Sequence, residues 1–317
     1  MINKIKLALK GMAMGIAEVI PGVSGGTIAF ITGIYEQLLN SINAFGPSLI
    51  TDFREGGVKK VWKSIDGNFL VSLLFGMAVG MIIGVFGVSH LLENYPPLIW
   101  AFFFGLIIAS TIYIGKQIEK WNWKNIISLV LGAIVAYGIT VLTPAEGSTS
   151  LIFVFFCGAI AISALILPGI SGSFILLMLG MYSYIVTETV KPALSTFATD
   201  KLIVMGVFAL GCLTGLMTIS RALSWTFNNY RSITLSVLTG FMLGSLNKIW
   251  PWRNAVEWLR DASGNIIMKD GLPKKILIEE NVFPSAYDGG DPYVLGVIVL
   301  VVIGFLSVFA IERLGKK

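Results

Sequence analysis

Residues 17–35 read AEVIPGVSGGTIAFITGIY, and residues 163–182 read SALILPGISGSFILLMLGMY. Both stretches are strongly apolar, yet each carries a proline, glycines and a serine at matching places in its middle. A proline followed by glycines ends one helix, and the serine that follows can cap the start of the next. The pattern therefore predicts two helices that are interrupted at the same point. The residues that make the breaks are Pro21 and Gly22 in the first copy and Pro168 and Gly169 in the second.

The composition places these breaks in a membrane protein. The chain has 317 residues, of which 55% are hydrophobic and only 13% are charged, and its mean hydropathy is +0.82. A soluble domain of this length needs far more polar groups to cover its surface. A helix needs about 20 apolar residues to cross a bilayer. The runs that meet this length lie at about 69–92, 97–117, 124–143, 202–224, 231–248 and 293–312.

The two interrupted regions cover about 8–42 and 150–190. We expect each to form a re-entrant helical hairpin, which enters and leaves the membrane on the same side. The alternative is a pair of fully crossing helices joined by a tight turn. Either way, the sequence predicts an all-α polytopic membrane protein.

The repeat extends beyond the hairpins. Each half, residues 1–143 and 150–312, reads as one hairpin plus three crossing helices, with an insert at about 250–292 in the second half. Because three crossings are an odd number, the second half must be inverted relative to the first, as in many secondary transporters. The positions that match after the hairpins include Gly76 with Gly211, Gly80 with Gly215, Tyr95 with Tyr230 and Gly105 with Gly240.

Charge placement gives the orientation. With the N-terminus inside, most basic residues fall in the inner segments, as the positive-inside rule requires, and the insert falls outside. We therefore expect a multi-pass protein with both termini in the cytoplasm. The inner basic residues are Lys4, Lys6, Lys10, Arg54, Lys59, Lys60, Lys63, Lys116, Lys120, Lys124, Arg221, Arg231, Arg313, Lys316 and Lys317.

The two breaks are candidate anion sites. An interrupted helix in hydrocarbon must be buried in protein or face water, so the breaks are expected to meet near the membrane midplane. Each leaves free amides at a helix N-terminus, where phosphate binds readily. The alternative is that both are tight turns whose glycines only allow close packing. The candidate phosphate-binding residues are Ser24, Gly25, Gly26, Thr27, Ser171, Gly172, Ser173 and Arg221.

Two charged residues in or beside apolar stretches sharpen this hypothesis. Glu18 lies three residues before Pro21, and its repeat counterpart is the apolar Leu165. It is either a structural hydrogen-bond partner or a carboxylate that couples or gates transport. Arg221 lies at the inner end of a crossing helix, where it either extends to the membrane surface or binds phosphate oxygens through two N–H groups.

The sequence offers little for catalysis. His90 is the only histidine, and Cys157 and Cys212 lie far apart in apolar segments. Enzymes that act on lipid phosphates usually need a histidine nucleophile or a cluster of metal-binding carboxylates. We therefore expect a protein that is not an enzyme and that has no metal, cofactor or nucleic-acid partner.

Three blocks of the chain resemble bacterial polyprenyl-phosphate transporters, which include the PopT-type undecaprenyl phosphate translocases. The resemblance spans about residues 8–312. It is carried by GMAMGIAEVIPGVSGGTIAFITGIYEQLL at 11–39, LPGISGSFILLMLGMY at 167–182 and SRALSWTFNNYRSITLSVLTGFMLGSLNKIWPW at 220–252.

The resemblance implies a protein of the bacterial cytoplasmic membrane that returns undecaprenyl phosphate from the outer to the cytoplasmic leaflet, which recycles the lipid carrier of cell-wall synthesis. The candidate residues given above are the positions that would carry this function. A proton or a sodium ion is the candidate coupling ion. From the residues alone, an ion-coupled transporter or channel for a small soluble anion is the alternative.

Overall fold

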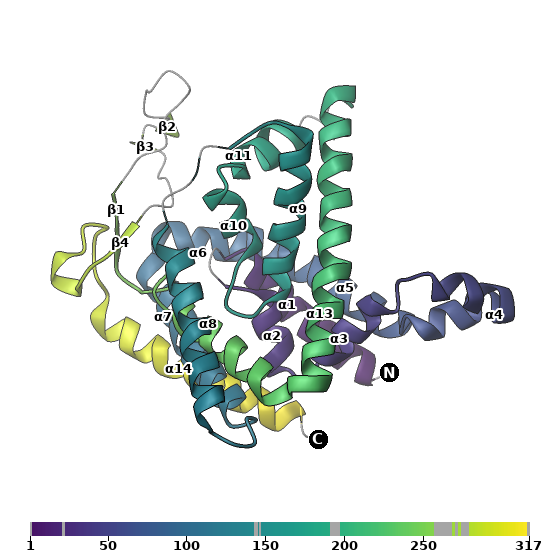
Figure 1. Ribbon diagram of the computed structural model, residues 1–317. Helices are drawn as coiled ribbons and strands as arrows, with labels where there is room; N and C mark the ends of the chain where they lie inside the picture. Colours follow the sequence, from purple (N-terminus) through teal and green to yellow (C-terminus); the bar gives the residue numbers. More distant parts are fainter. Residues whose placement is uncertain are drawn as a thin grey trace.

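The computed structural model of the chain is mostly helical (Figure 1). It describes residues 2–20, 23–142, 145, 147–190, 197–256, 268–269, 272–273 and 279–315. The first half contains α1 (Ile2–Glu18), α2 (Gly25–Ile31), α3 (Tyr35–Asn43), α4 (Ser48–Ser64), α5 (Gly67–Ile83), the π-helix η1 (Gly84–Val88), α6 (Ser89–Asn94), α7 (Pro96–Gly115) and α8 (Trp123–Val141). The second half contains α9 (Leu151–Ile166), α10 (Gly172–Met178), α11 (Tyr182–Ile185), the π-helix η2 (Val186–Val190), α13 (Thr199–Ser245), β1 (Arg253–Ala255), β2 (Met268–Lys269), β3 (Leu272–Pro273), β4 (Glu279–Asn281), the 3₁₀ helix η3 (Pro284–Ala286) and α14 (Val294–Gly315).

Several of these helices are long and apolar enough to cross a membrane. Within the described residues there are four such spans, at Gly67–Leu92, Pro96–Gly115, Trp123–Val141 and Thr199–Ser245. Leu151–Ile166 and Val294–Ala310 are shorter apolar helices. The prediction of an all-α polytopic membrane protein is confirmed, whereas the inverted repeat and the re-entrant path of the hairpins stay predictions.

The backbone repeats in detail around the two breaks. Both α2 and α10 have seven residues, and each begins directly after a serine of the repeated motif. Each then ends near a glycine with positive φ, Gly33 at 71° and Gly180 at 67°. Only glycine adopts this conformation without strain. Gly33 separates α2 from α3, and Gly180 separates α10 from α11. The sequence pattern alone indicated one continuous helix after each break.

A second backbone feature also repeats. Tyr95, between α6 and α7, has φ −137° and ψ 50°, and Tyr230, inside α13, has φ −140° and ψ 47°. At Tyr230 the chain bends and then resumes as a helix, so the spans expected at 202–224 and 231–248 lie in one bent element (Figure 1). One non-helical residue is enough for this bend, and no loop is needed.

Glycines bring the long helices into backbone contact. A Cβ placed on Gly76 would lie 2.0 Å from the carbonyl oxygen of Ala8 in α1, and one placed on Gly211 would lie 2.1 Å from that of Phe155 in α9. The other two pairs cross between the halves. Gly105 of α7 meets Val301 of α14, and Gly240 of α13 meets Leu129 of α8. The last helix of each half, α8 or α14, thus packs against a helix of the other half.

The insert and the chain ends lie at different ends of the bundle. β1 pairs with β4, and β2 pairs with β3, both antiparallel. The N-terminal end of α1 and the C-terminal end of α14 lie in the lower part of Figure 1, away from the β1–β4 sheet. The largest cluster of buried apolar side chains includes Ile20 and Ile166, which flank the two breaks.

Replacing Gly105 by alanine is expected to destabilise the bundle. The new methyl group would lie 2.0 Å from the carbonyl oxygen of Val301, so α7 and α14 would have to separate. Overpacking of this kind typically costs about 1–3 kcal/mol. The control is Gly138→Ala, because a Cβ at Gly138 has open space around it. Thermal unfolding in detergent should show a lower Tm for Gly105→Ala only, and equal Tm values would contradict the close contact.

Candidate functional site

The two breaks contact each other inside the protein. The Ser24 hydroxyl donates a hydrogen bond of 2.9 Å to the carbonyl oxygen of Leu165. In the other direction, the Gly169 amide donates to the Thr27 hydroxyl at 3.1 Å. A Cβ on Gly26 would lie 2.4 Å from the carbonyl oxygen of Ile166. The sequence-predicted residues of both copies are therefore brought together.

The N-terminus of α2 is satisfied by the protein itself. The Gly25 amide donates to the Glu18 carboxylate at 2.7 Å, and the Gly26 amide donates to the Ser24 hydroxyl at 3.0 Å. At the other end of α2, the Lys10 ammonium donates to the carbonyl oxygen of Thr32 at 2.6 Å. A negative charge at the start and a positive charge at the end both match the helix dipole. Two charged groups of α1 thus hold α2 in place.

The N-terminus of α10 differs. Ser171 occupies the N-cap position of α10. Its hydroxyl contacts the Ser173 hydroxyl at 2.9 Å and makes no capping hydrogen bond to the helix. Leu165 stands at the place that Glu18 has in the first copy. Among the described residues, no carboxylate is hydrogen-bonded to the first amides of α10. The two helix starts therefore have serines with similar extended backbone angles but different charged surroundings.

The remaining candidates lie as follows. Pro168 and Gly169 are buried, and Gly169, with φ of 85°, packs directly on the backbone of Met242 in α13. Pro21 and Gly22 lie outside the described residues. Arg221 is exposed and donates to the carbonyl oxygen of Phe45 at 3.3 Å, beside the α3–α4 connection. The structure thus places Arg221 against the end of α3, and it makes no hydrogen bond to the described residues of either break.

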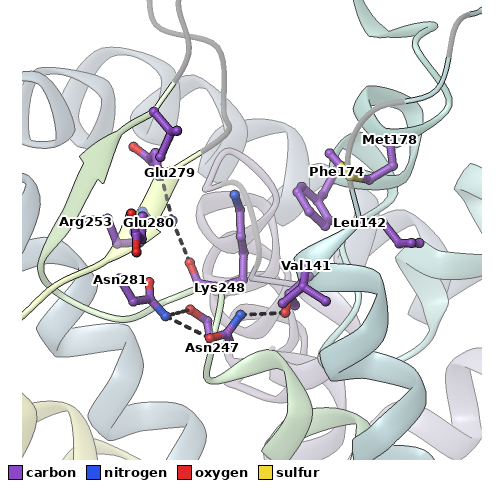
Figure 2. A pocket seen from close by; sticks show the side chains of 12 residues that line it. Val141, Leu142, Phe174, Met178, Asn247, Lys248, Arg253, Glu279, Glu280 and Asn281 are labelled. Carbon is purple, nitrogen blue, oxygen red and sulfur yellow. Dashed lines mark hydrogen bonds and ion pairs between the residues drawn. The ribbon is translucent and has the colours of Figure 1, made fainter.

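A pocket of about 400 Å³ adjoins the second break and was not predicted from the sequence (Figure 2). It contains two buried cations, Lys248 and Arg253, which are 7% and 8% exposed. Phe174, in the first turn of α10, lies on its wall. The signal was present in the quoted block, where a lysine follows the end of an apolar helix. The burial of Lys248 depends on the β1–β4 sheet of the insert, whose structure was not predicted from the sequence.

A second polar pocket, of about 450 Å³, lies around the bend of α13 and includes Lys120, Lys124 and Arg231. Arg231 also forms an ion pair of 2.8 Å with Glu36 in α3. An apolar pocket of about 430 Å³ shares Tyr230 and Ile233 with it and extends to Leu167 at the second break.

Residues 14–267 match the family described as undecaprenyl phosphate translocase-like. The chain belongs to this family. It is 41% identical over 319 residues to the polyprenyl-phosphate transporter of Vibrio cholerae serotype O1, a match that covers 100% of this chain and 98% of that protein.

A second relative of this undecaprenyl phosphate translocase-like protein is the polyprenyl-phosphate transporter of Staphylococcus aureus. The two are 31% identical over 269 residues, which covers 79% of this chain and 88% of the relative. No solved structure matches the chain. The resemblance to polyprenyl-phosphate transporters stated from the sequence blocks is confirmed.

Replacing Glu18 by leucine is expected to destabilise the protein, because it leaves the buried Gly25 amide without its acceptor. An unsatisfied buried donor costs about 1–3 kcal/mol. Glu18→Gln keeps a carbonyl oxygen as an acceptor at the same place, so it should lose less unfolding free energy than Glu18→Leu. Unfolding of both variants in a detergent titration checks this order. A Glu18→Leu variant as stable as wild type would show that the carboxylate is not what holds the N-terminus of α2.

Proposed function

We propose that this protein translocates undecaprenyl phosphate from the outer to the cytoplasmic leaflet of the bacterial cytoplasmic membrane, which recycles the carrier for cell-wall synthesis. Its relatives are named polyprenyl-phosphate transporters, which supports the substrate class. In this proposal both termini are cytoplasmic and the insert is outside.

The observation that carries the proposal is the contact between the two breaks. One break already holds a negative group, since the Gly25 amide binds the Glu18 carboxylate. The other presents a helix start after an equivalent serine, and among the described residues no carboxylate is bound there. A phosphate head group is the chemical equivalent of the missing anion, and backbone amides at a helix start suit it. The second break, with Ser171, Gly172 and Ser173, is therefore the proposed first contact.

The chemistry of the lipid fits this arrangement. Moving the long hydrocarbon tail out of the bilayer would cost about 0.8 kcal/mol per CH₂ group, so the tail stays in lipid. The phosphate head group cannot cross hydrocarbon unaided, because its lost hydration must be replaced. Each helix N-terminus would contribute up to about 2 kcal/mol in buried geometry. A protein that carries only the head group past the midplane is sufficient.

Glu18 is the proposed coupling or gating residue. Its carboxylate and a phosphate would compete for the amides of α2, because both are acceptors for the same donors. Protonating Glu18, or pairing it with a sodium ion, would weaken its hold on the Gly25 amide. Such an exchange would link head-group binding at the first break to a proton or a sodium ion. Arg221, at the α3–α4 connection, remains a candidate contact at the cytoplasmic surface.

The test is translocation of undecaprenyl phosphate in liposomes that contain the purified full-length protein. We expect protein-dependent flipping by wild type, with the lipid chemically unchanged, and a loss of at least tenfold in the Ser24→Ala/Ser171→Ala variant. The control is Thr214→Ala/Thr218→Ala, which removes two exposed hydroxyls of α13.

Ser171→Ala alone keeps the test valid if the double variant unfolds, because the hydroxyl of Ser171 bonds only to that of Ser173 among the described contacts. Full flipping by Ser171→Ala would remove the second break from the pathway. Absence of flipping by wild type, with and without a pH or sodium gradient, would refute the lipid proposal. Uptake of a small anion in the same liposomes would then favour a soluble-anion transporter.

A further inference from the structure

The bend of α13 joins a polar pocket to an apolar pocket. The polar pocket, of about 450 Å³, is lined by the α7–α8 connection, the start of α8 and the residues on both sides of Tyr230. The apolar pocket, of about 430 Å³, is lined by both arms of α13 and reaches Leu167, the residue before Pro168 of the second break. Because Tyr230 and Ile233 line both pockets, the two form one continuous groove, which we call the α13 groove.

A buried asparagine gives the polar pocket a defined shape. Asn125, in the first turn of α8, is 2% exposed. Its side-chain amide donates to the carbonyl oxygen of Lys120 at 2.6 Å, and its backbone amide donates to the Asn122 side chain at 3.0 Å. These bonds hold the α7–α8 connection against the start of α8, so that Lys120 and Lys124 line the same pocket.

The polar pocket has an excess of positive charge after the described carboxylates around it are counted. Its lining contains the cations Lys120, Lys124 and Arg231 and the carboxylate Glu119. Arg231 also pairs with Glu36 at 2.8 Å, so three cations stand against two carboxylates. Among the described residues, neither lysine forms an ion pair. The positive end of the α8 dipole adds to this excess, so the pocket is suited to an anion.

Exposed aromatic side chains indicate that the polar pocket lies at the depth of the lipid head groups. Trp121 and Trp123 alternate with pocket residues along the α7–α8 connection, and both are exposed. On α13, Trp225 and Tyr230 are exposed, with ring centroids 5.6 Å apart. Tryptophan and tyrosine gather at the two membrane–water interfaces. The membrane-length helix α8 also begins at Trp123, as expected for a pocket at this depth.

The groove lies at the end of the bundle where the chain termini are found. The bend of α13 is in the lower part of Figure 1, as are the N-terminal end of α1 and the C-terminal end of α14. In the function proposed above this end is cytoplasmic. The polar pocket then faces the leaflet in which the transported lipid arrives.

The apolar pocket presents hydrocarbon even where its wall carries threonines. The Thr226 hydroxyl donates to the carbonyl oxygen of Leu223 at 2.9 Å, and the Thr234 hydroxyl donates to that of Tyr230 at 3.0 Å. Both hydroxyls are thus used within α13. Wall residues such as Val237 are half-buried, so the pocket can be reached. A lipid tail can lie here and stay in apolar surroundings, whereas a free inorganic anion would use only the polar pocket.

We propose that the α13 groove holds undecaprenyl phosphate after it has crossed the midplane, with the head group at Lys120 and Lys124 and the first part of the tail in the apolar pocket. The proposal rests on the function proposed above and adds a release site at the cytoplasmic leaflet. Leu167 belongs to the groove wall, and Gly169 of the same break packs on the backbone of Met242 in α13. The path from the second break to the lysines therefore runs along α13.

The experiment uses the full-length protein in phosphatidylcholine nanodiscs and a polyprenyl phosphate with a photoreactive group on its first isoprene unit. Cross-links in wild type should map to residues 119–125 or 228–233. Unlabelled undecaprenyl phosphate should compete for these cross-links at least tenfold better than undecaprenol, phosphatidylglycerol or inorganic phosphate.

Each contrary result of this competition overturns the proposal for a different reason. Cross-links only elsewhere would remove the lipid from the groove. Equal competition by inorganic phosphate would indicate a pocket for a free anion, and equal competition by phosphatidylglycerol would indicate a general surface for anionic lipids. Equal competition by undecaprenol would show that the lysines do not recognise the head group.

Paired variants separate the two lysines from general surface charge. Lys120→Gln/Lys124→Gln should lower the cross-linking yield at least tenfold, and Lys120→Arg/Lys124→Arg should keep most of it, because arginine retains a charge-assisted contact with phosphate. The matched control is Lys59→Gln/Lys63→Gln, which removes two charges from exposed positions on α4 and should keep the wild-type yield. An equal loss in the control would overturn the assignment of the head group to Lys120 and Lys124.

A larger side chain tests the apolar pocket. Thr226→Phe places a ring in the space proposed for the tail and should lower the cross-linking yield at least threefold. Thr218→Phe, at an exposed position two turns earlier on α13, should not. Equal yields of the two variants would overturn the placement of the tail.

Stability and flipping distinguish failure of the release site from failure of the proposed function. Both lysines are exposed, so Lys120→Gln/Lys124→Gln should keep the wild-type Tm while flipping falls with cross-linking. Wild-type yield and wild-type flipping in this variant would overturn the release site and leave the proposed function standing. Wild-type protein that cross-links in the groove but does not flip the lipid would refute the proposed function instead. If the variant has a lower Tm, the competition on wild-type protein decides, because it needs no variant.

Discussion

A backbone that is interrupted inside an apolar protein must find partners for its free amides and carbonyls. Much of this structure follows from how the first break meets that requirement. Glu18 accepts from Gly25, Ser24 accepts from Gly26, and Ser24 donates to Leu165 in the other half of the chain. Each unsatisfied group would cost several kcal/mol in hydrocarbon. The partners come from both halves, so satisfying the break also joins the halves.

The same requirement is met differently in the second copy. A strictly symmetric protein would have either two internal carboxylates or none. Here α2 is held by Glu18 at its start and Lys10 at its end, whereas α10 has the hydroxyl pair of buried Ser171 and half-buried Ser173 at its start and Lys248 close to the ring of Phe174. One short helix is thus charge-matched at both ends, and within the described residues the other has no carboxylate hydrogen-bonded to its first amides.

The sequence predicted the elements of this fold well, because their determinants are local. Proline, glycine and serine set the breaks, and the length of the apolar runs set the crossing helices. It also predicted that the two breaks meet, as their hydrogen bonds show, although it left the role of Glu18 open between structural and functional. It missed the pocket, because Lys248, Phe174 and Arg253 belong to segments whose proximity depends on tertiary packing. The contact of Arg221 with Phe45 also depends on tertiary packing, so the sequence did not predict it.

The exchange of helices between the halves has a mechanical meaning. Since α7 packs on α14 and α8 packs on the second part of α13, these four segments form one intertwined unit that draws on both halves. By the same kind of glycine contact, α1 packs on α5 and α9 packs on the first part of α13. The chain passes between these groups of helices at Tyr95 and Tyr230, two residues with matching non-helical backbone angles, and again between α8 and α9. Tyr95 and Tyr230 thus mark places where one packing pair of helices continues into another, and the packing pairs do not coincide with the sequence repeats.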